Sequence, residues 1–129
     1  MTWRLCPGQA DLTPDEKTVV FEAIEHFNND RYELSAYVVM NDHVHVLFTP
    51  EGSHSVEDLI HTWKSFTANV LQRTTGRSGS VWQGEYFDRI IRDEDELLEK
   101  GKYIVENPWK RWPNITDYAW VGFKGSSDA

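Results

Sequence analysis

The spacing of apolar and polar residues predicts four extended segments and three helices. Runs rich in β-branched and aromatic residues indicate extended segments at 2–5, 31–40, 43–50 and 81–92. Apolar residues recurring every three or four positions predict helices over 12–30, 55–73 and 94–107. Thr13, Pro14 and Glu16 form a capping-box start for the first helix, and Pro108 is expected to end the last one.

The order of these segments predicts the fold class. The sequence β-α-β-β-α-β is that of an α+β, ferredoxin-like split βαβ fold, in which two helices pack on one face of an antiparallel sheet. The additional helix over 94–107 would cover or flank the other face. We expect one domain over residues 1–129, with a flexible tail at 125–129.

Composition and charge narrow the class of protein. A single cysteine, Cys6, excludes an intrachain disulfide, and no apolar run approaches the ~18 residues of a membrane span, so a cytoplasmic protein without membrane contact is expected. The net charge of −8 argues against a nucleic-acid partner. However, residues 1–60 carry three basic and eleven acidic residues, whereas 61–111 carry nine and eight. The second half could therefore present a local basic surface.

The segment "NDHVHVLF" (41–48) places two histidines one residue apart on an expected strand. Because side chains alternate along a strand, His43 and His45 point to one face, while Val44, Val46 and Phe48 point to the other. Two imidazoles could bind one divalent ion and leave positions open for substrate oxygens. The simpler alternative is that both rings only form hydrogen bonds in the sheet.

The final helix carries a second unusual residue. Its apolar stripe consists of Leu97, Leu98, Ile104 and Val105. Tyr103 lies nearly opposite this stripe, with Asn107 one turn beyond it. An amide oxygen such as that of Asn107 suits magnesium or manganese as a third ligand. A tyrosine hydroxyl becomes a useful nucleophile when a metal polarises a phosphodiester, although Tyr103 taken alone is more simply an ordinary surface residue.

Several separated motifs together resemble one known family. The segments "AYVVMNDHVHVLFTP", "HTWKSFTANVLQRTTGRSGSVWQGEYFDRIIRDEDEL" and "KYIVENPWKRWP" follow one another in the order found in the REP-associated tyrosine transposases. These proteins are the single-tyrosine branch of the HUH endonucleases, named for a His, a bulky apolar residue and a His. The resemblance extends over about residues 2–121. Two departures are Asn41-Asp42, where the family commonly has Pro-Asn, and a short first strand.

The resemblance implies a role for each matching residue. His43, His45 and Asn107 would bind a catalytic Mg²⁺ or Mn²⁺, and Tyr103 would be the nucleophile. The expected activity is metal-dependent cleavage and rejoining of single-stranded DNA through a 5′-phosphotyrosyl intermediate. The expected partners are single-stranded or hairpin DNA, such as REP-like palindromes, and the protein would be a monomer or a homodimer.

Residues of the second half are candidates for binding DNA. The predicted contacts are Lys64, Trp82, Arg89, Arg92, Lys110 and Arg111, and Tyr86 is a further candidate for stacking on bases. Trp82 could equally belong to the core, and Trp109, Trp112 and Trp120 are expected to fix the C-terminal segment to the domain. Two other functions stay open: a catalytically inactive, domesticated DNA-hairpin-binding protein, and a metal-dependent hydrolase that activates water.

Overall fold

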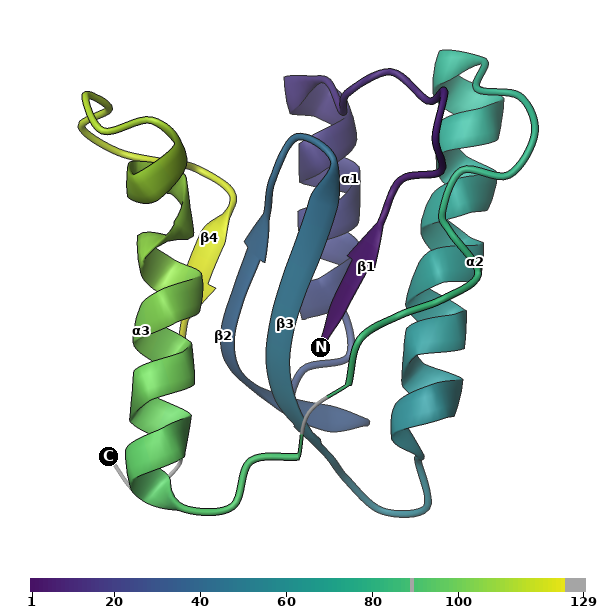
Figure 1. Cartoon of the computed structure of the whole chain (residues 1–129). Helices are drawn as coiled ribbons and strands as arrows, with labels where there is room; N and C mark the ends of the chain where they lie inside the picture. The colour runs from purple at the N-terminus through teal and green to yellow at the C-terminus, as the bar shows by residue number, and fades with distance from the viewer. Residues whose placement is uncertain (89, 125–129) are drawn as a thin grey trace.

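The computed structural model describes residues 1–88 and 90–124, and within them a four-stranded antiparallel sheet packs with three helices. The strands are β1 (Thr2–Arg4), β2 (Tyr32–Val39), β3 (His43–Pro50) and β4 (Val121–Phe123). The helices are α1 (Pro14–Glu25), α2 (Val56–Thr75) and α3 (Glu94–Arg111). The strands lie in the order β1-β3-β2-β4 (Figure 1). The predicted α+β fold is confirmed, and none of the described helices is both long and apolar enough to cross a membrane.

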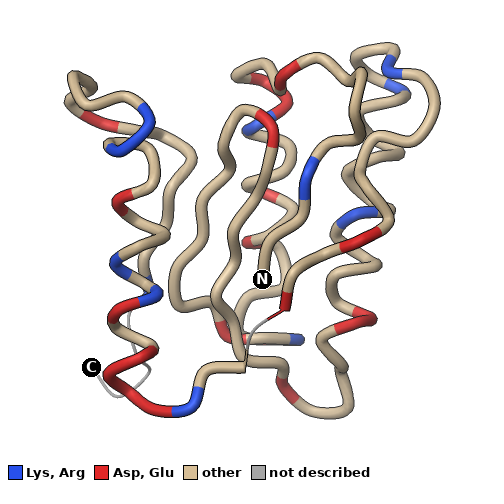
Figure 2. The backbone as a smooth tube through the Cα atoms, viewed as in Figure 1, with Lys and Arg blue, Asp and Glu red and all other residues tan. Residues whose placement is uncertain are grey.

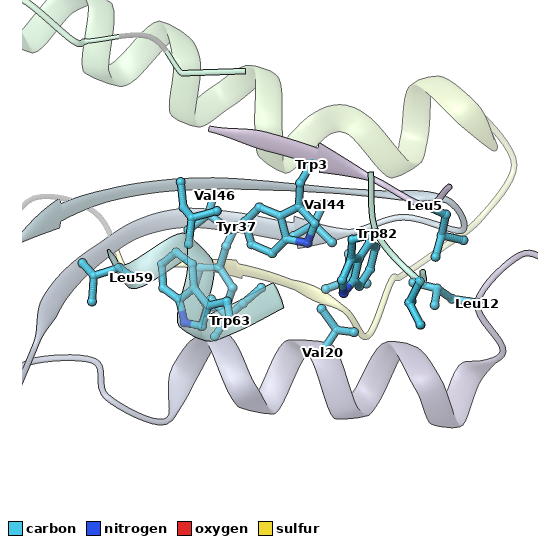
Figure 3. Packing of buried hydrophobic residues seen from close by; sticks show 14 of the residues in the cluster. Trp3, Leu5, Leu12, Val20, Tyr37, Val44, Val46, Leu59, Trp63 and Trp82 are labelled. Carbon is cyan, nitrogen blue, oxygen red and sulfur yellow. The ribbon is translucent and has the colours of Figure 1, made fainter. Parts of the chain in front are cut away.

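The sheet separates two hydrophobic clusters. The larger one lies between the sheet and the pair α1 and α2, and Trp3, Tyr37, Val44, Val46 and Trp63 are among its members (Figure 3). The smaller one lies between the opposite face and α3, and consists of Ala36, Val38, Met40, Leu47 and Ile104. The final helix therefore covers the second face, as the sequence predicts.

The first helix begins as predicted and ends early. The Thr13 hydroxyl accepts from the Glu16 N–H, and the Glu16 carboxylate accepts from the Thr13 N–H, which completes the capping box. The helix ends at Glu25, although its apolar pattern predicts a helix to residue 30. The Asn28 side chain instead accepts from the Leu34 N–H, and the next residue, Asn29, has a left-handed φ of 69°.

The extended segment predicted at 81–92 is not a strand of the sheet. It touches β1 and the residue that follows β1 through two isolated bridges, Thr2 with Phe87 and Leu5 with Trp82. Between these bridges β1 advances by three residues and its partner by five, so two extra residues bulge out and interrupt the ladder. The segment nevertheless lies along the outer edge of β1.

The C-terminal part differs most from the expectation. Pro108 does not end α3: its ring is buried, and its carbonyl accepts from the Trp112 N–H, so a further turn forms. β4, which the sequence pattern does not predict, pairs with β2. Expectations about the tail at 125–129 lie outside the described residues.

Aromatic residues hold this C-terminal segment against α1. The ammonium group of Lys17 lies 4.8–5.6 Å from the ring centroids of Trp112, Tyr118 and Trp120. The Trp120 indole N–H also donates to the Thr18 hydroxyl at 2.9 Å. The predicted fixing role is confirmed for Trp112 and Trp120, whereas the indole of Trp109 donates locally, to the Ile115 carbonyl.

Candidate active site

The two histidines of β3 lie on the face covered by α3. Val44 and Val46 are fully buried in the opposite cluster, which confirms the predicted alternation. The imidazole rings of His43 and His45 have their centroids 4.8 Å apart and their planes inclined by 84°. The pair therefore presents two ring edges to one small region of the face.

Both rings are oriented through the same nitrogen. His43 Nδ1 lies 2.7 Å from the carboxylate of Asp42, and His45 Nδ1 lies 2.8 Å from the hydroxyl of Thr2. When Nδ1 donates to an oxygen, the lone pair of a neutral imidazole is on Nε2, which is the arrangement of metal-binding histidines. The donor set therefore fits a divalent ion, and Asp42, which departs from the family pattern, supplies one of the orienting oxygens.

Burial also favours the neutral form of His45. Removal from water, together with the neighbouring His43, lowers the pKa of His45 to about 3. The ring is consequently uncharged at neutral pH, and an uncharged ring is the form that binds a metal.

Tyr103 of α3 stands next to this pair. Its ring centroid is 6.0 Å from that of His45, and the side chain is 47% exposed, so the prediction that it lies outside the core is confirmed. Leu98, predicted in the apolar stripe, is 64% exposed, whereas Gly101 and Ile104 are buried. The contact stripe of α3 thus differs by one position, and Tyr103 remains accessible.

Asn107 lies one turn further along the helix. A Cβ at Gly101 would lie 3.9 Å from Leu47, while Tyr103 is beside His45, so α3 runs antiparallel to β3 (Figure 1). Asn107 therefore stands toward the end of β3 at which His43 lies. Within the described part of the chain, no third His, Cys, Asp or Glu completes a metal-binding cluster with the pair. The role of Asn107 as a third ligand stays a prediction.

A pocket of about 300 Å³ opens beside His45 and Tyr103. Leu47 and Ile104 contribute apolar surface from the sheet and from α3. Asp88 and Lys100 add one acidic and one basic side chain. The nucleophile candidate therefore faces a cavity of mixed character and not a flat surface.

Basic residues near the site are unevenly distributed. The Lys110 ammonium lies 4.5 Å from the centroid of the Tyr103 ring, and its side chain is exposed. Arg111 is exposed beside Trp112, and Arg92 is exposed just before α3. Acidic residues occupy the first turn of α3 and basic residues its last turn (Figure 2). Lys110 and Arg111 therefore lie at the end of the helix beyond Tyr103, whereas Arg92 lies at its start.

Two predicted DNA contacts, Trp82 and Lys64, are placed differently. Trp82 is 6% exposed, packs edge-on against Trp3 and donates to the Thr67 hydroxyl, so its predicted stacking role disagrees with the structure. The Lys64 ammonium donates to the Gln83 carbonyl at 2.6 Å and holds the 81–88 segment on α2, which occupies the predicted phosphate contact. Arg89 lies outside the described residues.

Phe87 is an exposed aromatic that the sequence interpretation missed. Its side chain is 66% exposed and lines the pocket beside Tyr103, whereas Tyr86 packs against the main core. Val81 and Trp82 are both buried and Gly84 is exposed, so the bulged segment does not follow the period-two alternation of a regular strand. The exposure of Phe87 therefore depends on the bulge, for which the sequence gives no clear signal.

The chain is similar to known proteins in its sequence and in its fold. The family model for IS200-like transposases matches residues 12–107. The REP-associated tyrosine transposase of Escherichia coli (strain K12) is 26% identical over 121 residues, which are 89% of this chain and 69% of that protein. A solved structure of a REP-associated tyrosine transposase bound to a REP hairpin has a TM-score of 0.74 at 23% identity, covering 93% of this chain and 72% of that one.

The match to the family model includes the histidine pair and the tyrosine of the candidate site. It includes β3 with His43 and His45, and it reaches through α3 to Tyr103 and Asn107. Since residues 12–107 make up well over half of the 129, the chain belongs to the IS200-like transposase family.

Proposed function

We propose that the protein is a metal-dependent endonuclease and strand transferase that acts on single-stranded, hairpin-associated DNA. The observation that carries this function is the meeting of Tyr103 with the histidine pair, with 6.0 Å between the rings of Tyr103 and His45. A tyrosine that only packs in the core would not have to lie beside the histidines. A histidine pair that only forms hydrogen bonds in the sheet would not have to lie beside a tyrosine. Family membership and relatives named as transposases support the same conclusion.

Tyr103 would attack the scissile phosphorus through its phenolic oxygen. The P–O3′ bond breaks, the upstream fragment leaves with a 3′-hydroxyl, and the downstream fragment stays attached as a 5′-phosphotyrosine. The phenolic proton is lost to solvent, and the departing 3′-oxygen takes up a proton. The covalent bond retains the phosphodiester energy, so a 3′-hydroxyl of another strand can displace Tyr103 and rejoin the DNA.

The residues around Tyr103 have distinct roles in this proposal. His43 and His45 would hold Mg²⁺ or Mn²⁺ through Nε2, with Asn107 as a third ligand, while Asp42 and Thr2 orient the rings. Such an ion withdraws charge from the scissile phosphate. Lys110, placed over the Tyr103 ring, would contact a phosphate oxygen of the bound strand.

The substrate follows from access to the site and from the relatives. A phosphodiester in a paired duplex cannot readily enter a pocket between β3 and α3, whereas an unpaired strand can. The solved structure similar to this chain carries a REP hairpin. We therefore infer that a hairpin with unpaired flanking nucleotides is the substrate of this chain.

Labelled DNA tests this function directly. A hairpin oligonucleotide from the genomic sequence around the gene, labelled at its 3′ end, is incubated with the protein and Mn²⁺. The label should become covalently attached to the protein, because the downstream fragment is the one retained. The same oligonucleotide labelled at its 5′ end should yield a free, shorter fragment. Cleavage without an attached label would indicate hydrolysis by water, and intact DNA would indicate binding alone.

A further inference from the structure

The backbone of Phe87 is held by two hydrogen bonds although its side chain faces solvent. Its N–H donates to the Thr2 carbonyl at 2.9 Å, and its carbonyl accepts from the Thr2 N–H at 2.9 Å. The Thr2 hydroxyl in turn lies 2.8 Å from His45 Nδ1. Thr2 therefore holds the backbone of Phe87 and also contacts a candidate metal ligand, which places Phe87 beside the site.

An exposed phenylalanine points to a ligand where it lines a pocket together with other apolar residues. Phe87 is 66% exposed and lines the 300 Å³ pocket with His45 and Tyr103. Ile91 and Ile104 add further apolar surface to the same pocket. Apolar walls and one aromatic face beside a nucleophile suit a flat, partly apolar ligand. A phosphate group alone would not use them.

We propose that this pocket holds one unpaired base of the DNA strand, the base next to the scissile phosphate, with Phe87 stacked on its face. The inference rests on the proposed function, because it takes Tyr103 as the attacking group. A base placed there would bring its own phosphate to the region between Tyr103 and the histidine pair.

Stacking would place the strand without selecting its sequence. Every base has a π-face, so an aromatic side chain binds all four bases. Asp88 and Lys100 also line the pocket. Each of the four bases can form a hydrogen bond with an acceptor or a donor of this kind, so the two residues do not select one base. The pocket therefore contributes affinity and alignment, and sequence recognition belongs to other parts of the hairpin.

A double-mutant cycle tests the contact between ring and base. Affinities are measured in the Tyr103→Phe background, which prevents cleavage, with hairpins carrying one abasic nucleotide at successive flanking positions. Phe87→Leu keeps apolar volume without the ring, and Phe87→Trp restores an aromatic face. Stacking on one base corresponds to roughly 5- to 150-fold in affinity.

At the flanking position next to the cleavage site, Phe87→Leu and the abasic nucleotide should each weaken binding. Together they should weaken it no further, because both remove the same contact. Phe87→Trp should bind like the parent protein. Phe66→Leu is the matched control: Phe66 is 54% exposed on α2, on the other side of the sheet, and its loss should change nothing.

The outcomes separate this inference from the proposed function. Independent effects of ring and base, or unchanged affinity in Phe87→Leu, would overturn the base pocket even if the protein with Tyr103 forms a covalent adduct. Coupling without any adduct would support the pocket and overturn the proposed chemistry. A protein that binds none of the hairpins would overturn both.

Discussion

The histidine pair shows how one residue can orient another. Asp42 is 60% exposed, yet its carboxylate lies 2.7 Å from His43 Nδ1, and this contact with His43 lowers the pKa of Asp42. Thr2 acts in the same way on His45. Partners of this kind keep a metal-binding nitrogen pointed at the ion.

Replacing Asp42 by alanine should weaken metal binding. His43 would lose the group that fixes its orientation, and affinity for Mn²⁺ should fall roughly 10-fold or more. Isothermal titration with Mn²⁺ measures the change, and Asp30→Ala, an exposed aspartate in the turn after α1, is the control. Equal affinities in Asp42→Ala and Asp30→Ala would show that the contact does not serve a metal site.

Lys110 is the cation best placed to act on the strand at Tyr103. Lys110→Met should slow formation of the covalent adduct roughly 10- to 100-fold, since a charged hydrogen bond to phosphate is lost. Lys102→Met is the control, because Lys102 is exposed on another side of α3 and lies 3.9 Å from Glu106. If both variants slow the reaction alike, general charge and not position explains the effect.

At the scale of single residues, the sequence predicts the direction in which a side chain points better than the partner that it contacts. Strand alternation placed His43 and His45 together, and helix geometry placed Tyr103 outside the core. Trp82 and Lys64 were misplaced because their partners, Thr67 and the Gln83 carbonyl, depend on how the 81–88 segment crosses α2. Residue type alone does not contain that information.

Among the elements, α3 is the one whose placement matters most for the proposed site, because it carries Tyr103 and lies close to the sheet. A Cβ at Gly101 would meet Phe123 at 3.6 Å and Ala36 at 3.9 Å, which are ordinary contacts. A Cβ at Gly122 of β4 would instead lie 2.2 Å from the buried ring of Tyr37. A methyl group therefore fits at Gly101 and does not fit at Gly122.

Alanine at these two positions should change stability in opposite directions. Gly101→Ala should raise the free energy of unfolding by about 0.5–1 kcal/mol, because alanine favours a helix and the space exists. Gly122→Ala should lower it by about 1–3 kcal/mol through overpacking against Tyr37. Urea denaturation of both variants measures the changes. If Gly101→Ala is destabilised, the space between α3 and the sheet is too small for a methyl group.

The sequence predicts those elements whose apolar residues recur at a regular spacing. The helices and the β2–β3 hairpin follow from repeated apolar positions. β4 has only three residues and pairs with β2, which is distant in the sequence, and Pro108 lies inside α3 with its ring buried. Both depend on tertiary packing, which local patterns do not encode.

The whole molecule is joined across its helices by a buried ion pair. Glu16 of α1 is 2% exposed, and Arg77, just after α2, donates to both of its carboxylate oxygens at 2.6 and 2.8 Å. The Arg77 hydrogen bond is the main reason that the pKa of Glu16 falls to about 2. Glu16 thus joins the start of α1 to the loop that follows α2.

This pair predicts how stability depends on pH. A lowered pKa in the folded state adds stability above the unfolded value of 4.5, and that stability is lost as pH falls toward about 2. Glu16→Gln should lower the free energy of unfolding by about 3 kcal/mol at pH 7 and flatten its decline between pH 4.5 and 2. Denaturation across this range measures both. If the free energy of unfolding of Glu16→Gln falls with pH as steeply as that of the unsubstituted protein, groups other than Glu16 cause the acid sensitivity.

The proposed function of the whole molecule rests on Tyr103, so Tyr103→Phe tests the central claim most directly. The substitution removes one oxygen from a half-exposed side chain, and folding should be unaffected. Binding, cleavage and adduct formation are measured together on one 3′-labelled hairpin with Mn²⁺. The account predicts that binding persists while cleavage and the covalent adduct both disappear. Cleavage that persists in Tyr103→Phe would contradict it.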